Sequence, residues 1–155
     1  MASSVKVRLP DIAGKARKLK DDSEKILAQE IEIARGEIDA RTQAGLDVEN
    51  NPFKPYSPLY KAEREQRGYS TEVNLTITGT MLRSMTSRVE AIANGLAGVI
   101  FFISGRPDGE SNAEIARKHN EGDYGTGRKK VRKFFALSEK QIREIISNVR
   151  KGIRL

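Results

Sequence analysis

His119 is the only histidine of the chain and the first residue whose type could support catalysis. An imidazole can act as a general base near neutral pH, but it needs an orienting partner and a nucleophile or acid on the substrate side. Asn120 and Glu121 follow it directly, yet neighbours in the sequence do not by themselves converge on one another. A histidine nuclease motif would require further histidines. We therefore predict that His119 caps a short helix or hydrogen-bonds the backbone at the turn into Gly122.

Two other patterns match parts of known sites without completing them. Asp108 and Glu110 lie two residues apart on a predicted turn, like the acidic half of a metal-dependent nuclease site, but no lysine stands at the required offset. The glycine-rich segment 122–129 has the composition of a phosphate-binding loop, but it lacks the required spacing and the preceding hydrophobic strand. The sequence therefore predicts no catalytic residue, no cofactor and no metal, and we expect a protein that is not an enzyme.

Basic residues gather in and after the same region. Seven lysines and arginines stand against two acids between residues 117 and 133, in a chain of formal net charge +7. A positive loop attracts a polyanion or an acidic protein surface, and charge alone does not decide between them. The residues that we expect to face a partner ring or genomic double-stranded DNA are Arg128, Lys129, Lys130, Arg132 and Lys133.

Composition limits the class of protein. A length of 155 residues indicates one domain, taken here as residues 1–155. The absence of cysteine excludes disulfides and thiolate sites and is typical of a protein that matures in a reducing cytoplasm. No segment approaches the ~20 consecutive apolar residues of a membrane span, and the N-terminus lacks the pattern of a signal peptide. We expect a soluble protein without a membrane partner.

A long amphipathic helix is predicted over residues 11–44, after a short strand over residues 5–9. Asp11 offers an N-cap, apolar residues recur at steps of three and four, and Gly45 ends the pattern. Such a helix measures roughly 50 Å at ~1.5 Å per residue, which is more than the rest of a small domain can cover. We therefore expect part of its apolar stripe to contact another copy of the chain. The residues of that expected contact are Ile26, Ile31 and Ile38.

An irregular segment is predicted over residues 50–72, because Pro52, Pro55 and Pro58 interrupt regular structure there. Its apolar side chains should fold onto a core edge or onto a neighbouring subunit. These side chains are Phe53, Tyr56, Leu59 and Tyr60.

The last half of the chain predicts a sheet and two further helices. Strands over residues 73–77, 87–92 and 98–103 form a sheet within residues 73–104, with Asn94-Gly95 as a hairpin turn. A short helix over residues 113–119, a basic loop over residues 121–133 and a C-terminal helix over residues 138–151 follow, the last begun by a capping box of Ser138 and Gln141. The expected fold is α+β: a long N-terminal helix packed on a small, mostly antiparallel sheet, with a short helix and a C-terminal amphipathic helix.

Three segments, in this order, resemble the tail-completion or virion-morphogenesis proteins of long-tailed bacteriophages. They run from Leu75 to Met85 (LTITGTMLRSM), from Ile115 to Gly122 (IARKHNEG) and from Arg132 to Ser138 (RKFFALS). Two positions depart from the family pattern: Val131 replaces a frequent proline, and Ile77 replaces a frequent aspartate or asparagine.

The resemblance implies a structural virion protein that forms a ring, commonly of six subunits, in the phage neck or at the head-proximal end of the tail. Such a ring joins the tail tube to the head connector, with the subunits in the host cytoplasm before assembly. Its implied partners are further copies of the chain, neck and connector proteins, tail-tube proteins and, transiently, genomic DNA in the lumen. A tail terminator, a basic DNA-binding module and a small metal-dependent nuclease remain as alternatives.

Overall fold

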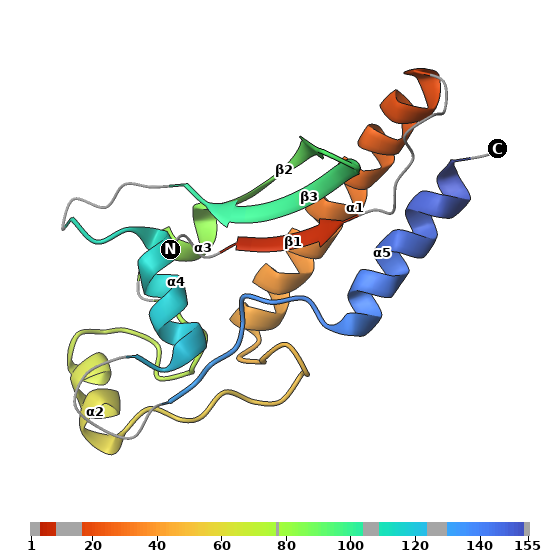
Figure 1. Ribbon diagram of the computed structural model, residues 1–155. Coiled ribbons are helices and arrows are strands. Elements are labelled where there is room, and N and C mark those ends of the chain that lie inside the picture. Colours follow the sequence, from red (N-terminus) through yellow and green to blue (C-terminus); the bar gives the residue numbers. More distant parts are fainter. Residues whose placement is uncertain (1–3, 9–16, 77, 104–108, 124–129, 154–155) are drawn as a thin grey trace.

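The computed structural model describes residues 4–8, 17–76, 78–103, 109–123 and 130–153 (Figure 1). Within these residues it confirms the α+β prediction, with one three-stranded antiparallel sheet and five helices. The elements in chain order are β1 (Ser4–Arg8), α1 (Arg17–Gln43), α2 (Pro58–Gln66), α3 (Thr80–Arg83), β2 (Met85–Ile92), β3 (Gly95–Phe102), α4 (Asn112–Glu121) and α5 (Glu139–Gly152). None of the helices in the described part of the chain is long and apolar enough to cross a membrane.

The sheet has β3 at its centre, with β1 on one side and β2 on the other. Ile92 pairs with Gly95, so Ala93 and Asn94 form the two-residue loop of the β2–β3 hairpin. The predicted hairpin is therefore confirmed, with its loop one residue earlier than the Asn-Gly pair. Gly95 opens β3 at a φ of 139°, which a glycine adopts without steric cost.

The predicted strand over residues 73–77 is wrong, because residues 73–76 pair with no strand. Leu75 has a φ of 55°, in the left-handed region that a strand does not contain. Its side chain is 8% exposed and belongs to the core, so burial of the leucine outweighs the backbone strain. Ile77 lies outside the described residues.

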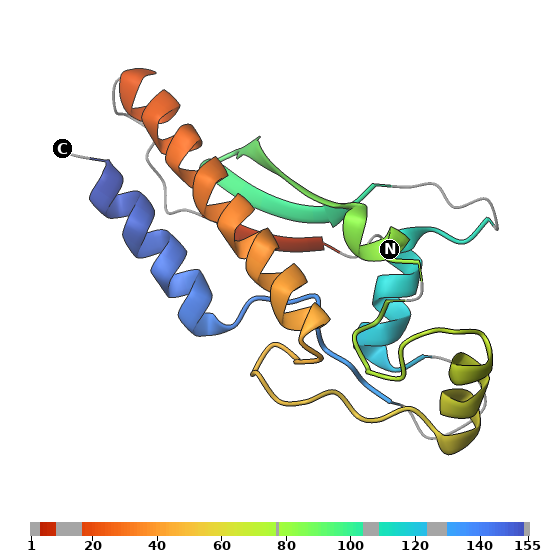
Figure 2. The ribbon, with the colours of Figure 1, turned by 180° about the vertical axis from the view of Figure 1, so that it is seen from behind.

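α1 runs across one face of the sheet, and Figure 2 shows it in front of the strands when the molecule is seen from behind. Because side chains alternate along a strand, Gly98 and Ile100 of β3 face α1 while Val99 faces away. A Cβ at Gly98 would lie 2.1 Å from Cγ1 of Ile31, so the glycine permits the close approach of helix and strand. The side chains of α1 that are buried in the core here are Leu27, Ile31, Ala34 and Ile38.

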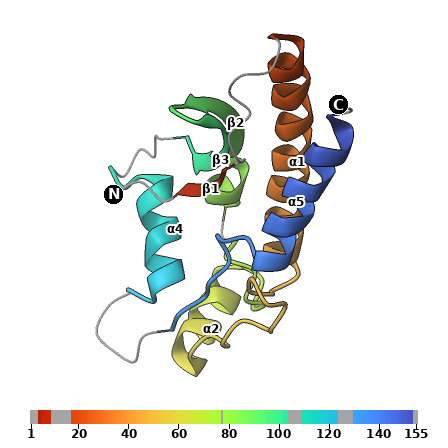
Figure 3. The ribbon, with the colours of Figure 1, turned by 45° about the vertical axis from the view of Figure 1, so that its right-hand side comes forward.

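α5 packs alongside α1 in the opposite direction (Figure 3). Its N-terminus is the predicted capping box: the Ser138 side chain accepts from the Gln141 backbone, and the Gln141 side chain accepts from the Ser138 backbone. Arg41 of α1 reaches the segment before α5, where its Nη2 donates to the carbonyl oxygen of Phe134 at 2.8 Å. Burial lowers the pKa of Arg41, which remains a cation at any physiological pH.

The prediction that Ile31 and Ile38 contact a neighbouring subunit is wrong, whereas the same prediction for Ile26 stays a prediction. Ile31 and Ile38 are 1% and 0% exposed within a single chain. Ile26 is partly buried against α5, where a Cβ at Gly152 would lie 2.6 Å from its Cδ1. The sheet and α5 together cover the apolar stripe of α1, so the length of the helix does not leave that stripe open.

The prediction that residues 50–72 are irregular is also wrong for Pro58–Gln66, which form α2. Proline disrupts a helix interior, but it is favourable at the first helical position, where its missing N–H would have no intrahelical partner. Phe53 is likewise no interface residue, because it is 7% exposed and packs in the core.

Candidate interaction surface

α2 lies outside the core of the molecule, at the end of the chain's fold farthest from the C-terminus (Figures 1 and 3). Ser57 is its N-cap, and the serine Oγ accepts a hydrogen bond from the backbone N–H of Tyr60 at 3.3 Å. Pro58 occupies the first helical position. The only buried residue of the helix is Arg64, so packing of an apolar face does not attach α2 to the rest of the protein.

Arg64 attaches α2 through its guanidinium group, and the residue is 2% exposed. Its Nε donates to the carbonyl oxygen of Ser70 at 2.6 Å, and its Nη2 donates to that of Thr76 at 2.9 Å. Three tyrosine rings surround the guanidinium carbon, with centroids 4.9, 5.8 and 5.9 Å away for Tyr56, Tyr60 and Tyr69. Cation–π attraction and the two carbonyls together compensate for the loss of water around this charge.

Tyr56 joins this cluster to the basic segment that follows α4. The guanidinium of Arg132 lies 5.2 Å from the centroid of Tyr56, and its Nη2 donates to the carbonyl oxygen of Lys54 at 3.1 Å. Lys130 donates from Nζ to the carbonyl oxygen of Pro55 at 3.0 Å. Burial raises the pKa of the Tyr56 hydroxyl, while the two neighbouring guanidinium groups oppose the shift.

The structure thus brings together two groups of residues that the sequence predicted separately: the aromatic segment and the basic segment. The prediction that Arg132 faces a partner ring or DNA is wrong, because Arg132 is 7% exposed and binds the backbone of its own chain. Lys133 is exposed, and Arg128 and Lys129 lie outside the described residues.

The exposed part of this region is defined here as the α2 surface: Leu59, Tyr60 and Tyr69. Leu59 is 83% exposed, the highest value among the large hydrophobic side chains of the described residues. Tyr60 and Tyr69 are 37% and 38% exposed, so each contributes one side to the cluster around Arg64 and one side to solvent. The predictions that Leu59, Tyr60 and, in part, Tyr56 are available to a partner remain open.

Arg64 and Tyr69 are functional-site residues that were not predicted from the sequence. Ser57-Pro58 was the available signal for α2, because a serine followed by proline is typical of a helix start. Tyr60 and Arg64 are four residues apart and would then share one helix face. Nothing in the local sequence indicates that Tyr69 returns to the same guanidinium.

Two further cations of the basic region form ion pairs within α4 and its neighbours. Nη2 of Arg117 lies 2.7 Å from Oε1 of Glu114, and the same guanidinium pairs with Glu121. Lys118 pairs with Glu110. Both carboxylate partners raise the pKa of Arg117, and Glu110 raises the pKa of Lys118. Two of the seven positive charges counted between residues 117 and 133 are therefore balanced locally.

His119 is partly buried on α4, with its ring edge-on to Phe134 at a centroid distance of 6.4 Å. Its main-chain carbonyl oxygen accepts from the backbone N–H of Arg132 at 2.9 Å. This bond does not involve the imidazole, so the role predicted for the His119 side chain stays a prediction. Gly122, in the left-handed conformation at a φ of 73°, is the C-cap of the helix. Burial, with a smaller contribution from the charge of Arg132, lowers the pKa of His119 to about 4.

Asn120 fixes α4 to the segment before α5. Its Nδ2 donates to the carbonyl oxygen of Phe135 at 2.9 Å, and its Oδ1 accepts from the N–H of Phe135 at 3.0 Å. These two hydrogen bonds give Asn120, which follows His119 in the sequence, a structural role. In the part of the chain that the structure describes, no three His, Asp or Glu side chains lie close enough to hold a metal ion, and Asp108 lies outside that part.

Replacing Arg64 with methionine should release α2. The variant leaves the carbonyls of Ser70 and Thr76 without their charged donor, at an expected cost of about 2 kcal/mol. We expect the amides of α2 to lose their protection in hydrogen exchange, while those of α1 and α5 keep it. Arg67→Met is the matched control, since that arginine is exposed and pairs with Glu63 at the surface. Unchanged protection of α2 in Arg64→Met would contradict the role given to this guanidinium.

Comparisons with protein-family models, with curated proteins and with solved structures find no match for this chain.

Proposed function

We propose that the chain is a structural subunit of a bacteriophage virion, which forms a ring in the neck or at the head-proximal end of the tail and joins the tail tube to the head connector. The observation that carries this proposal is the α2 surface, where Leu59 is 83% exposed on an ordered helix that buries only one of its own residues. The resemblance of three segments to tail-completion proteins supplies the class of assembly.

An isolated helix of nine residues is unstable in water, so a protein that keeps one outside its core must hold it by specific contacts. Here those contacts are the two hydrogen bonds and three ring contacts of Arg64. They orient Leu59 and Tyr60 without burying them. Tyrosine and leucine side chains that are ordered yet open to solvent are typical of a surface that a partner covers. Exposed apolar side chains on an ordered helix are unfavourable in a monomer. They are explained if the chain is a subunit of a larger assembly in which a partner covers them.

The rival DNA-binding module finds less support in the described residues. Arg132 and Lys130 donate to backbone carbonyls, and Arg117 and Lys118 pair with carboxylates. Fewer cations then remain to neutralise phosphates, so the isolated chain should bind duplex DNA weakly. Tight, salt-sensitive binding of duplex DNA by a monomer would favour that rival instead.

Sedimentation and negative-stain electron microscopy of the purified chain test the proposal. We expect closed rings, most commonly of six subunits, in equilibrium with monomer. Leu59→Asp should shift this equilibrium to folded monomer, because it places a charge in the expected contact. Lys140→Asp, at a site on α5 that is 79% exposed in its side chain, is the control and should assemble as the wild type does. A wild-type chain that stays monomeric at every concentration and never enters a particle would overturn the proposal.

A further inference from the structure

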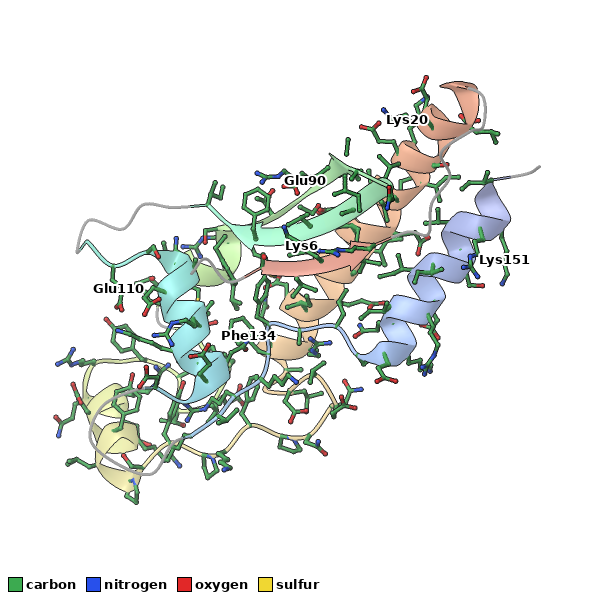
Figure 4. The ribbon with its side chains drawn as sticks, in the orientation of Figure 1. Lys6, Lys20, Glu90, Glu110, Phe134 and Lys151 are labelled. Carbon is green, nitrogen blue, oxygen red and sulfur yellow. The ribbon has the colours of Figure 1, made fainter. Side chains whose placement is uncertain are left out.

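The face of the sheet that points away from α1 is not crossed by any described helix, and Figure 1 shows its strands unobstructed. Ala97 and Val99 of the central strand point to this side and are only 2% and 3% exposed. The register places Lys6 and Arg88 on either side of Val99, and Arg8 and Glu90 on either side of Ala97. Long charged side chains therefore cover two small apolar residues, and Figure 4 labels Lys6 and Glu90 on this face.

This outer sheet face, defined by Lys6, Arg8, Arg88, Glu90 and Phe101, carries more positive than negative charge. The Arg88 guanidinium lies 4.5 Å from the centroid of Phe101 and pairs with Glu90 at 2.6 Å. Lys6 and Arg8 are exposed on the edge strand β1. A partner for this face should therefore be acidic, and it should offer a narrow apolar ridge to the small side chains beneath the cations.

The solvent side of α1 has these properties and lies on the opposite side of the molecule (Figure 2). Ile33 is 57% exposed there, second only to Leu59 among the large hydrophobic side chains of the described residues. Gly36 and Ala40 lie three and seven residues further along the same helix side, and their small size permits close packing. The acids that border this side are Glu30, Glu32, Glu37 and Asp39. Over residues 19–43 as a whole, seven acids outnumber four basic residues.

We propose that the solvent side of α1 of one subunit docks on the outer sheet face of the next subunit. This inference rests on the proposed function and names a second contact between copies of the ring, besides the α2 surface. Ile33 would pack against the aliphatic parts of the long charged side chains that flank Ala97 and Val99. Lys6 and Arg8 would lie against Glu30 and Glu37 of the neighbouring copy, which accept hydrogen bonds from Asn148 and Gln141 of their own α5 at 3.0 and 2.7 Å. The contact joins two different surfaces, and such heterologous contacts close into rings when the rotation between subunits permits it.

The dimensions of the two surfaces agree. The 27 residues of α1 span about 40 Å at ~1.5 Å per residue, and the eight residues of β3 span about 26 Å at ~3.3 Å per residue. Each α1 would then lie between two sheets, its own and that of its neighbour. Layers of helix and sheet that cover one another in this way bury both faces of each sheet.

Charge reversal on each surface tests the contact. We expect Lys6→Glu with Arg8→Glu, and separately Glu30→Lys with Glu37→Lys, to raise the concentration needed for half-assembly at least tenfold. The four-fold variant that combines them should assemble again, because the attraction is restored with opposite signs. An equimolar mixture of the two double variants should also assemble, as each offers the surface that the other lacks. Sedimentation measures all four samples, and far-UV circular dichroism verifies that each is folded.

Reversals of the same size on α5 serve as controls. Lys140→Glu with Arg143→Glu, and Glu139→Lys with Glu144→Lys, change the net charge equally at exposed positions and should leave assembly unchanged. If the wild type assembles and the reversals on α1 and β1 have no effect, this inference falls while the proposed ring stands. If only the β1 reversal disrupts particles, the sheet face contacts a part of the neighbouring copy other than α1 and the proposal is wrong. A wild-type chain that never assembles overturns both.

Discussion

Ile31→Asp should abolish folding of the chain. Ile31 is 1% exposed, and its Cγ1 lies 2.1 Å from the position that a Cβ of Gly98 would take, so the side chain is enclosed against β3. Loss of the aliphatic side chain together with burial of a carboxylate costs at least about 5 kcal/mol, which is comparable to the whole stability of many domains. The expected result is a chain without a cooperative thermal transition, and circular dichroism with differential scanning calorimetry measures it.

Ile33→Asp is the matched control, because it makes the same chemical change two residues along the same helix. Its side chain is 57% exposed on the opposite side of α1, so the variant should melt within a few degrees of the wild type. In the proposed ring it should nevertheless weaken assembly. If the Ile31→Asp variant folded and only failed to assemble, Ile31 would be an interface residue. That result would contradict its place in the core.

Acidification from neutral pH to pH 4 should destabilise the protein by about 3 kcal/mol through His119 alone. In the unfolded chain this imidazole has its ordinary pKa near 6.5, whereas burial lowers the pKa to about 4 in the folded chain. The unfolded state therefore binds the proton first as the pH falls. The stabilisation is complete above pH 6.5 and is lost progressively as the pH falls through 4, where the folded state also becomes protonated.

His119→Gln isolates this contribution, since it removes the only histidine of the chain. Urea unfolding at a series of pH values should give a shallower loss of stability for the variant between pH 6.5 and 4. The ion pair with Arg35 lowers the pKa of Glu32, and this shift affects the wild type and the variant equally. Because the wild type has a single imidazole, its NMR titration should report a midpoint near pH 4. Parallel pH profiles, or a midpoint near 6.5, would contradict the buried state of His119.

Local sequence signals were sufficient where neighbouring residues determine the structure. The amphipathic period predicts α1 and α5, the serine and glutamine of the capping box place the start of α5, and Asn94-Gly95 predicts the hairpin to within one residue. Backbone hydrogen bonds and caps of this kind involve residues only a few positions apart. The same reasoning failed at residues 73–76, because burial of Leu75 imposes a left-handed backbone that no local propensity favours.

Residue types and their order are enough to predict the α+β class, the absence of thiol chemistry and the two segments, one aromatic and one basic, that carry the candidate surface. How these residues are used depends on the folded arrangement. Arg132 and Tyr56 are 76 positions apart in the chain, but the guanidinium of Arg132 lies 5.2 Å from the ring centroid of Tyr56. A count of charges treats Arg132 as an exposed cation, whereas in the structure its side chain is buried and connects these two segments. Ile31 and Ile33 are equally apolar in the sequence, yet one is buried and the other is exposed. The physical reason is that burial depends on which distant elements, here β3 and α5, cover each side of the helix.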